Sequence, residues 1–86
     1  MNRKYQPLQD YLKRLPRSQG SVTLSFHEIE KLIGSRLPPS AYEHRAWWSN
    51  QAEVSNRPQA KAWREAGFEV ETVKPDRKDG MVSFSR

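Results

Sequence analysis

The stretch from Leu37 to Asn50, which reads LPPSAYEHRAWWSN, constrains the fold more than any other part of the chain. It holds two of the three tryptophans, and consecutive helical residues point about 100° apart. Two neighbouring indole rings can therefore rarely enter the same core. We expect one ring of the Trp47–Trp48 pair to be buried, together with Trp63. The other should be partly exposed as a stacking surface or protein contact.

Length and composition limit the architecture. A chain of 86 residues forms one domain, 1–86, with a small core, because it buries only about 60% of its unfolded surface. Residues 1–6 are polar and basic, and we expect them to form a flexible N-terminal tail. The chain has no cysteine, which excludes disulfides and thiolate metal sites. Its two histidines lie far apart, so we expect no metal and no cofactor.

The charge of the chain indicates its class of partner. The formal net charge is +5, which favours acidic partners, and nucleic acid is the commonest of these. No apolar run approaches the roughly 20 residues of a membrane-spanning helix, and no signal peptide is visible. We therefore expect a cytoplasmic protein that does not contact a membrane.

Apolar spacing and helix-capping residues predict four helices. Ser25 and Glu28 form a capping box before the second helix, and Ser40 with Glu43 forms another before the third. On the second helix, Glu30 is expected to face water. The predicted helices cover about 7–15, 26–33, 41–48 and 58–66.

Alternation of apolar and polar residues predicts three strands, over 21–25, 68–74 and 81–85. In the second strand, Thr72 should share the inward face with Phe68 and Val70, and Val73 should point outward. The last two strands are joined by the charged segment KPDRKDG, residues 74–80, which is rich in turn residues.

This order of elements predicts an α+β fold of winged-helix type. In that fold, a lone early strand pairs with a C-terminal hairpin, and three antiparallel strands cover the helices. One helix is in excess of the pattern, so either the third or the fourth would be the recognition helix. A generic small α+β domain is the alternative.

The sequence also resembles an uncharacterised family of small bacterial domains, which occur alone or beside nuclease domains such as GIY-YIG nucleases. The resemblance covers about residues 5–86. At Phe68 this chain departs from the tryptophan that members often carry, and its basic tip is longer than usual. The resemblance implies company with nucleic-acid enzymes and gives no mechanism. It is carried by YQPLQDYL, VTLSFHEIEKLIG, LPPSAYEHRAWWSN, QAKAWREAG and VSFSR.

No constellation of catalytic residues is visible, so we expect a protein that is not an enzyme. Metal-dependent nucleases need clustered carboxylates, whereas the ten acidic residues of this chain are scattered. Neither a phosphate-binding glycine loop nor a pair of nucleophile and base is present.

Basic and amide side chains predict a double-stranded DNA interface. Arginine and lysine neutralise phosphates, while asparagine, glutamine and arginine can pair with base edges. A recognition helix and a basic hairpin wing would make these contacts. The alternative is that these are solvated helix faces, or that Arg45 stacks on Trp48 or pairs with Glu43. The candidates are Arg36, His44, Arg45, Asn50, Arg57, Gln59, Lys61, Arg64, Lys74, Arg77 and Lys78, with Trp47 and Trp48 as stacking or contact residues.

A second class of function uses the same surface for proteins. An exposed tryptophan beside Tyr42 and the Pro38–Pro39 pair suits a protein contact as well as DNA. The chain would then be an adaptor, a dimerising regulator or a mobile-element inhibitor acting on a nucleic-acid enzyme. Its partner would be another protein or a second copy of the chain.

Overall fold

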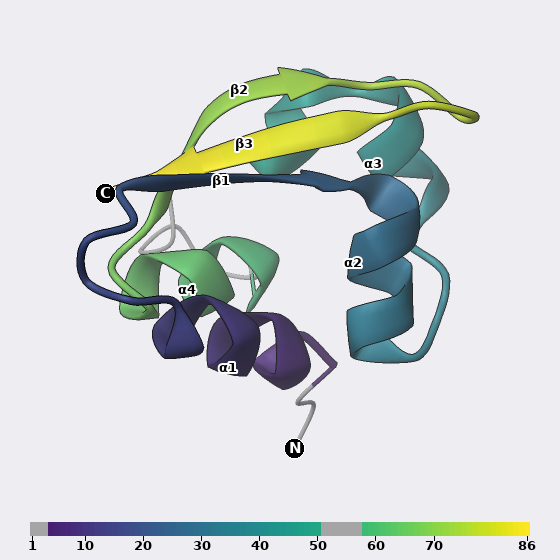
Figure 1. Cartoon of the computed structure of the whole chain (residues 1–86). Helices are drawn as coiled ribbons and strands as arrows, with labels where there is room; N and C mark the ends of the chain where they lie inside the picture. The colour runs from purple at the N-terminus through teal and green to yellow at the C-terminus, as the bar shows by residue number, and fades with distance from the viewer. Residues whose placement is uncertain (1–3, 51–57) are drawn as a thin grey trace.

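The structure is a computed structural model that describes residues 4–50 and 58–86. It is an α+β fold in which helices pack on a three-stranded antiparallel sheet (Figure 1). The elements are α1 (Gln6–Arg14), β1 (Ser21–Ser25), α2 (Phe26–Ile33), α3 (Pro39–Glu43), the 3-10 helix η1 (Arg45–Trp48), α4 (Pro58–Glu65), β2 (Glu69–Lys74) and β3 (Met81–Ser85).

The sheet has the order β1-β3-β2, so the early strand pairs with the C-terminal hairpin as expected. Figure 1 shows α1, α2 and α4 on one side of this sheet, with α3 beside the β2–β3 hairpin. The α+β class is therefore confirmed. The winged-helix likeness stays a prediction, because α3 and η1 separate α2 from the helix that precedes the hairpin.

The register of β2 differs from the simple alternation that we predicted. A β-bulge between Val70 and Thr72 adds one residue to this strand. An added residue reverses the facing of the side chains that follow it. As a result Val73 packs against the core and Thr72 is exposed, so our prediction for these two residues was wrong.

Both edge strands use side chains to bond backbone groups that another strand could otherwise take. On β1, Gln19 Nε2 donates to the carbonyl of Ser21 at 3.2 Å, and the N–H of Ser25 donates to the Glu28 carboxylate at 2.8 Å. On β2, the side-chain amide of Asn50 has the same role. Side chains thus limit the free edge of this small sheet.

The capping box of α2 is confirmed. Glu28 N–H donates to Ser25 Oγ at 3.0 Å, while the Glu28 carboxylate accepts from Ser25 N–H. At the other end, Gly34 has a φ of 72°. This left-handed conformation favours glycine, which explains why the helix stops there.

The predicted third helix is wrong in its start and its continuity. Pro38 is its N-cap and no side chain caps it, so Ser40 and Glu43 form no capping box. The proline at the first helical position is already set in the helical φ range and starts the helix without a side-chain cap. The helix then breaks at His44, whose φ of −128° and ψ of 121° are extended. This break separates α3 from η1.

Glu30 is not solvated as expected but connects α2 to the segment that follows. Its Oε2 atom accepts hydrogen bonds from Leu37 N–H, at 2.8 Å, and from the Tyr42 hydroxyl. Its Oε1 atom lies 3.5 Å from His27 Nδ1. Helical spacing alone placed Glu30 outward, but the loop folds back over this face of α2.

A ladder of aromatic rings forms the centre of the core. Trp48 stacks on Phe26 at 4.9 Å between centroids and on Trp63 at 5.8 Å, and Trp63 meets Phe84 at 5.5 Å. Trp48 and Trp63 are 2% and 0% exposed, whereas Trp47 is only partly buried. The prediction that one ring of the tryptophan pair enters the core with Trp63 is confirmed.

The prediction that residues 1–6 form a flexible tail is wrong for Tyr5 and Gln6. Tyr5 is buried in the core cluster, where its ring meets Trp47 edge-on at 6.0 Å, and Gln6 begins α1. Burial also raises the pKa of the Tyr5 phenol. Residues 1–3 lie outside the described residues.

Candidate nucleic-acid interface

One ion pair joins the basic hairpin tip to the end of α3. Arg77 Nη2 donates to Glu43 Oε2, and both residues are exposed. His44 and Arg45 follow Glu43 directly in the chain, so this pair places them at the same end of the molecule as the tip. We call this group of five exposed residues the basic end: His44, Arg45, Lys74, Arg77 and Lys78.

Asp76 organises the backbone of the tip. Its Oδ1 atom accepts hydrogen bonds from the backbone N–H groups of Lys78, at 2.7 Å, and Asp79, at 3.1 Å. These two bonds lower the pKa of the Asp76 carboxyl, and the nearby charges of Lys74 and Lys78 lower it further. The turn that presents the tip lysines thus depends on an ionised aspartate.

We predict that Asp76→Ala lowers stability at neutral pH and that the deficit disappears in acid. The folded-state pKa lies below the ordinary value of 3.8, so the contribution of Asp76 is complete above that value. It is lost as the pH falls through the folded-state pKa. Urea midpoints of wild type and variant at pH 7 and at successively lower pH measure this loss.

Asp79→Ala is the matched control, because it removes a carboxylate from the same tip and leaves the two Asp76 hydrogen bonds in place. A deficit in Asp76→Ala that persists unchanged in strong acid would contradict the assignment of the turn to the ionised carboxylate.

The basic residues of α4 are paired with carboxylates. Lys61 Nζ lies 3.8 Å from Glu65, and Arg64 Nη1 lies 3.3 Å from Glu69. Exposed pairs of this kind contribute little to stability, but they reduce the positive potential that α4 presents. Arg57, a further candidate next to this helix, lies outside the described residues.

Two amide candidates form hydrogen bonds within the fold. Asn50 Nδ2 donates to the Val70 carbonyl at 3.0 Å, while its Oδ1 accepts from Val70 N–H at 2.8 Å and from Trp63 Nε1 at 2.9 Å. Gln59 is 6% exposed and donates to the Trp47 carbonyl at 3.2 Å. A base edge would have to compete with these bonds, so we leave both residues out of the interface that we propose.

The remaining candidate residues differ in how far their side chains are exposed to solvent. Arg36 is exposed between α2 and α3. Trp48 is buried, and its Nε1 donates to the Ala41 carbonyl at 2.9 Å. Trp47 packs edge-on against Trp48 at 4.7 Å and keeps part of its ring accessible. Glu43, one of the two partners considered for Arg45, pairs with Arg77 instead.

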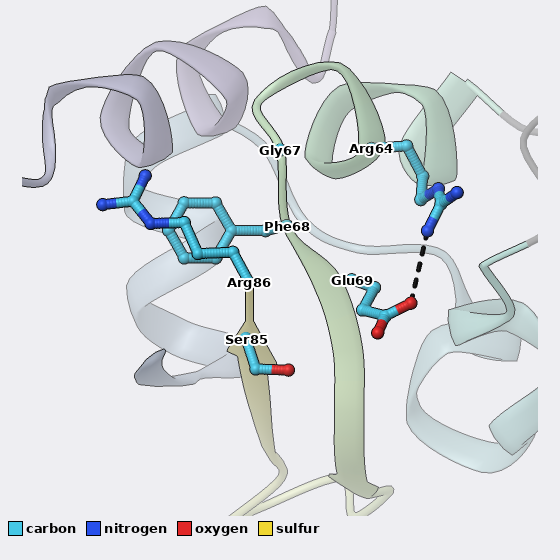
Figure 2. A pocket seen from close by; sticks show the side chains of 6 residues that line it. All are labelled: Arg64, Gly67, Phe68, Glu69, Ser85 and Arg86. Carbon is cyan, nitrogen blue, oxygen red and sulfur yellow. Dashed lines mark hydrogen bonds and ion pairs between the residues drawn. The ribbon is translucent and has the colours of Figure 1, made fainter. Parts of the chain in front are cut away.

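An open pocket of about 340 Å³ lies at the opposite end of the hairpin strands (Figure 2). Arg86, at one side of it, was missed by the sequence analysis. Its position depends on backbone contacts between segments that lie far apart in the chain, and no sequence motif marks it. The pocket is lined by Arg64, Gly67, Phe68, Glu69, Ser85 and Arg86.

The described residues, 4–50 and 58–86, have neither a metal-binding cluster nor a membrane-spanning helix. They contain no group of three or more histidine, cysteine, aspartate or glutamate side chains arranged to hold a metal ion. None of their helices combines the length and the apolar character that a membrane span requires.

Fold and surface together define a class: a small α+β domain with an aromatic core and a group of exposed cations at one end of its hairpin. The chain belongs to the family described as "Domain of unknown function (DUF7662)", whose model matches residues 5–85. This match confirms membership of an uncharacterised family of small domains. No curated protein and no solved structure matches the chain.

Proposed function

We propose that this domain binds double-stranded DNA without catalysing a reaction, and that the basic end makes the first contacts. The observation that carries the proposal is the Arg77–Glu43 ion pair, which joins the hairpin tip to the segment of His44 and Arg45. Cations from two separate parts of the chain thereby share one end of the domain. The expected association with nuclease domains points the same way and stays a prediction.

The chemistry of the basic end suits phosphate more than base edges. Within the part of the chain that the structure describes, Arg45 and Lys74 have no hydrogen-bonding or ion-pair partner for their side-chain cations. Lys78 follows Arg77 in the turn that Asp76 organises. Such cations release counterions from the DNA backbone, so binding should be salt-dependent and weakly sequence-specific. The β2–β3 tip would act as the wing.

The test is fluorescence anisotropy with a labelled duplex at about 50 mM salt, where phosphate contacts are strong. The triple variant Arg45→Glu, Lys74→Glu, Lys78→Glu should bind at least about tenfold more weakly than wild type. The slope of log K against log salt should fall by about three, since each lost phosphate contact removes about 0.9.

The matched control is Lys13→Glu, Arg14→Glu, Lys31→Glu, which changes the net charge equally on exposed positions of α1 and α2. It should retain most of the affinity. Equal losses in both triples would contradict a localised interface, and a wild type that binds no duplex at this salt would exclude the DNA proposal. A concentration-dependent mass in light scattering, without duplex binding, would favour the protein-interaction alternative.

A further inference from the structure

We propose that the pocket between Arg64 and Arg86 is a second contact for the DNA backbone, which receives phosphates of the strand held at the basic end. This inference rests on the proposed function. It assigns a role in DNA binding to Arg86. It also implies that the Glu69 carboxylate competes with DNA phosphates for Arg64.

The guanidinium of Arg86 is held in place by hydrogen bonds and still has unused N–H donors. Its Nε donates to the Gln19 carbonyl at 3.1 Å, its Nη2 donates to the Pro16 carbonyl, and its guanidinium lies 4.5 Å from the centre of the Phe68 ring. A guanidinium has five N–H donors, so about three remain for a ligand. In the described part of the chain no carboxylate pairs with Arg86. The guanidinium is therefore oriented and has no ion-pair partner among the described residues, which favours an anion at this place.

The shape of the pocket favours an extended anion. Figure 2 shows the two guanidinium groups on opposite sides of Phe68, with the Arg64 group directed toward Glu69. Successive phosphates of a strand could each meet one of the two groups. Phe68 is 1% exposed and already covered by Arg86, so its ring is not offered to a base. The pocket therefore suits backbone phosphates rather than nucleobases.

The position of the pocket relates it to the basic end. Ser85 lines the pocket and ends β3, while Met81 begins that strand opposite Lys74. Four steps of a strand cover about 14 Å, which corresponds to about four base-pair steps along the axis of a duplex. A DNA strand that runs beside the hairpin can thus reach both ends of it.

Glu69→Gln is the sharpest test, because it removes the carboxylate that pairs with Arg64 and leaves both arginines present. We expect this variant to bind the labelled duplex about threefold or more tightly, with a steeper salt dependence. Glu65→Gln is the matched control: it frees Lys61 on α4, away from the pocket lining, and removes the same charge. It should have a smaller effect.

Arg64→Ala and Arg86→Ala provide the opposite change. Each should weaken duplex binding severalfold and lower the slope of log K against log salt by about one. Arg14→Ala on α1 should have a smaller effect on both quantities. Because Arg86 also bonds two backbone carbonyls, thermal unfolding must show that its variant is folded. Arg64→Ala lacks that difficulty, since the contact it loses is an exposed pair.

The outcomes separate the two proposals. A wild type that binds no duplex contradicts the proposed function itself. The pocket assignment alone is overturned if wild type binds but the pocket variants behave like their controls. In that case Glu69→Gln changes the affinity as much as Glu65→Gln does, and Arg64→Ala as much as Arg14→Ala does. A titration with inorganic phosphate, followed by the amide shifts of Ser85 and Arg86, identifies the source: saturation at low millimolar phosphate without an effect of Arg64→Ala on duplex affinity would overturn a DNA contact in favour of free phosphate.

Discussion

Trp63→Ala should unfold the domain or lower its melting temperature by at least about 12 °C. The buried indole stacks on Trp48, meets Phe84 and donates to Asn50, so its removal leaves a cavity and takes one of two donors from Asn50 Oδ1. Truncation of a buried tryptophan costs about 3–5 kcal/mol, and 1 kcal/mol shifts a domain of this size by about 4–8 °C. Circular dichroism during heating measures the change.

Trp47→Ala is the control for this prediction. Trp47 is partly exposed and makes edge contacts with Tyr5 and Trp48, each worth about 0.5–1.5 kcal/mol beyond the area buried. Its truncation should cost less than half as much as that of Trp63. If Trp63→Ala melts within about 4 °C of wild type, the aromatic ladder does not hold the core in the way described.

Asn50→Ala should be the most destabilising change of a polar residue among the candidates. Counting only the described residues, it removes three hydrogen bonds, which tie the Asn50 side chain to the indole N–H of Trp63 and to both outward backbone groups of Val70. Since an orphaned buried donor costs about 1–3 kcal/mol, we expect a loss of about 2–4 kcal/mol in the free energy of unfolding, measured by urea denaturation. Hydrogen exchange at the Val70 amide should accelerate in parallel.

Gln59→Ala tests whether any buried amide would give the same result. Among the described residues, the Gln59 side chain makes one hydrogen bond, to the Trp47 carbonyl, so its loss should cost about 1 kcal/mol. DNA affinity provides a second readout. If Asn50→Ala loses duplex binding while its urea midpoint is unchanged, Asn50 contacts DNA as the sequence first indicated, and its structural role is refuted.

The regular elements could be predicted because their signals are local. The capping box of Ser25 and Glu28, the glycine stop at Gly34 and the alternation in residues 21–25 are each complete within a few residues. The pairing of β1 with the hairpin is not local, and it was predicted from the order of the elements and the winged-helix pattern. The capping box, the glycine stop and the alternation, by contrast, need no knowledge of the rest of the chain.

The errors arise where distant segments decide the local structure. The bulge in β2 turns Val73 toward the core and the break at His44 separates α3 from η1, and no short pattern marks either position. Asn50 and Gln59 have the same polarity as residues that read bases, yet their partners are a strand and a helix far along the chain. Arg86 is the converse case, since its two carbonyl partners lie in the turn before β1.

The side chains on the sheet edges have a further consequence for assembly. An added β-strand would need a row of free N–H and C=O groups, and fibrils grow from such rows. Gln19 and Glu28 bond groups at the two ends of β1, and Asn50 bonds those of Val70 on β2, so a growing fibril would meet interrupted templates on both sides. A basic domain concentrated along a polyanion, where copies meet often, would thereby resist aggregation.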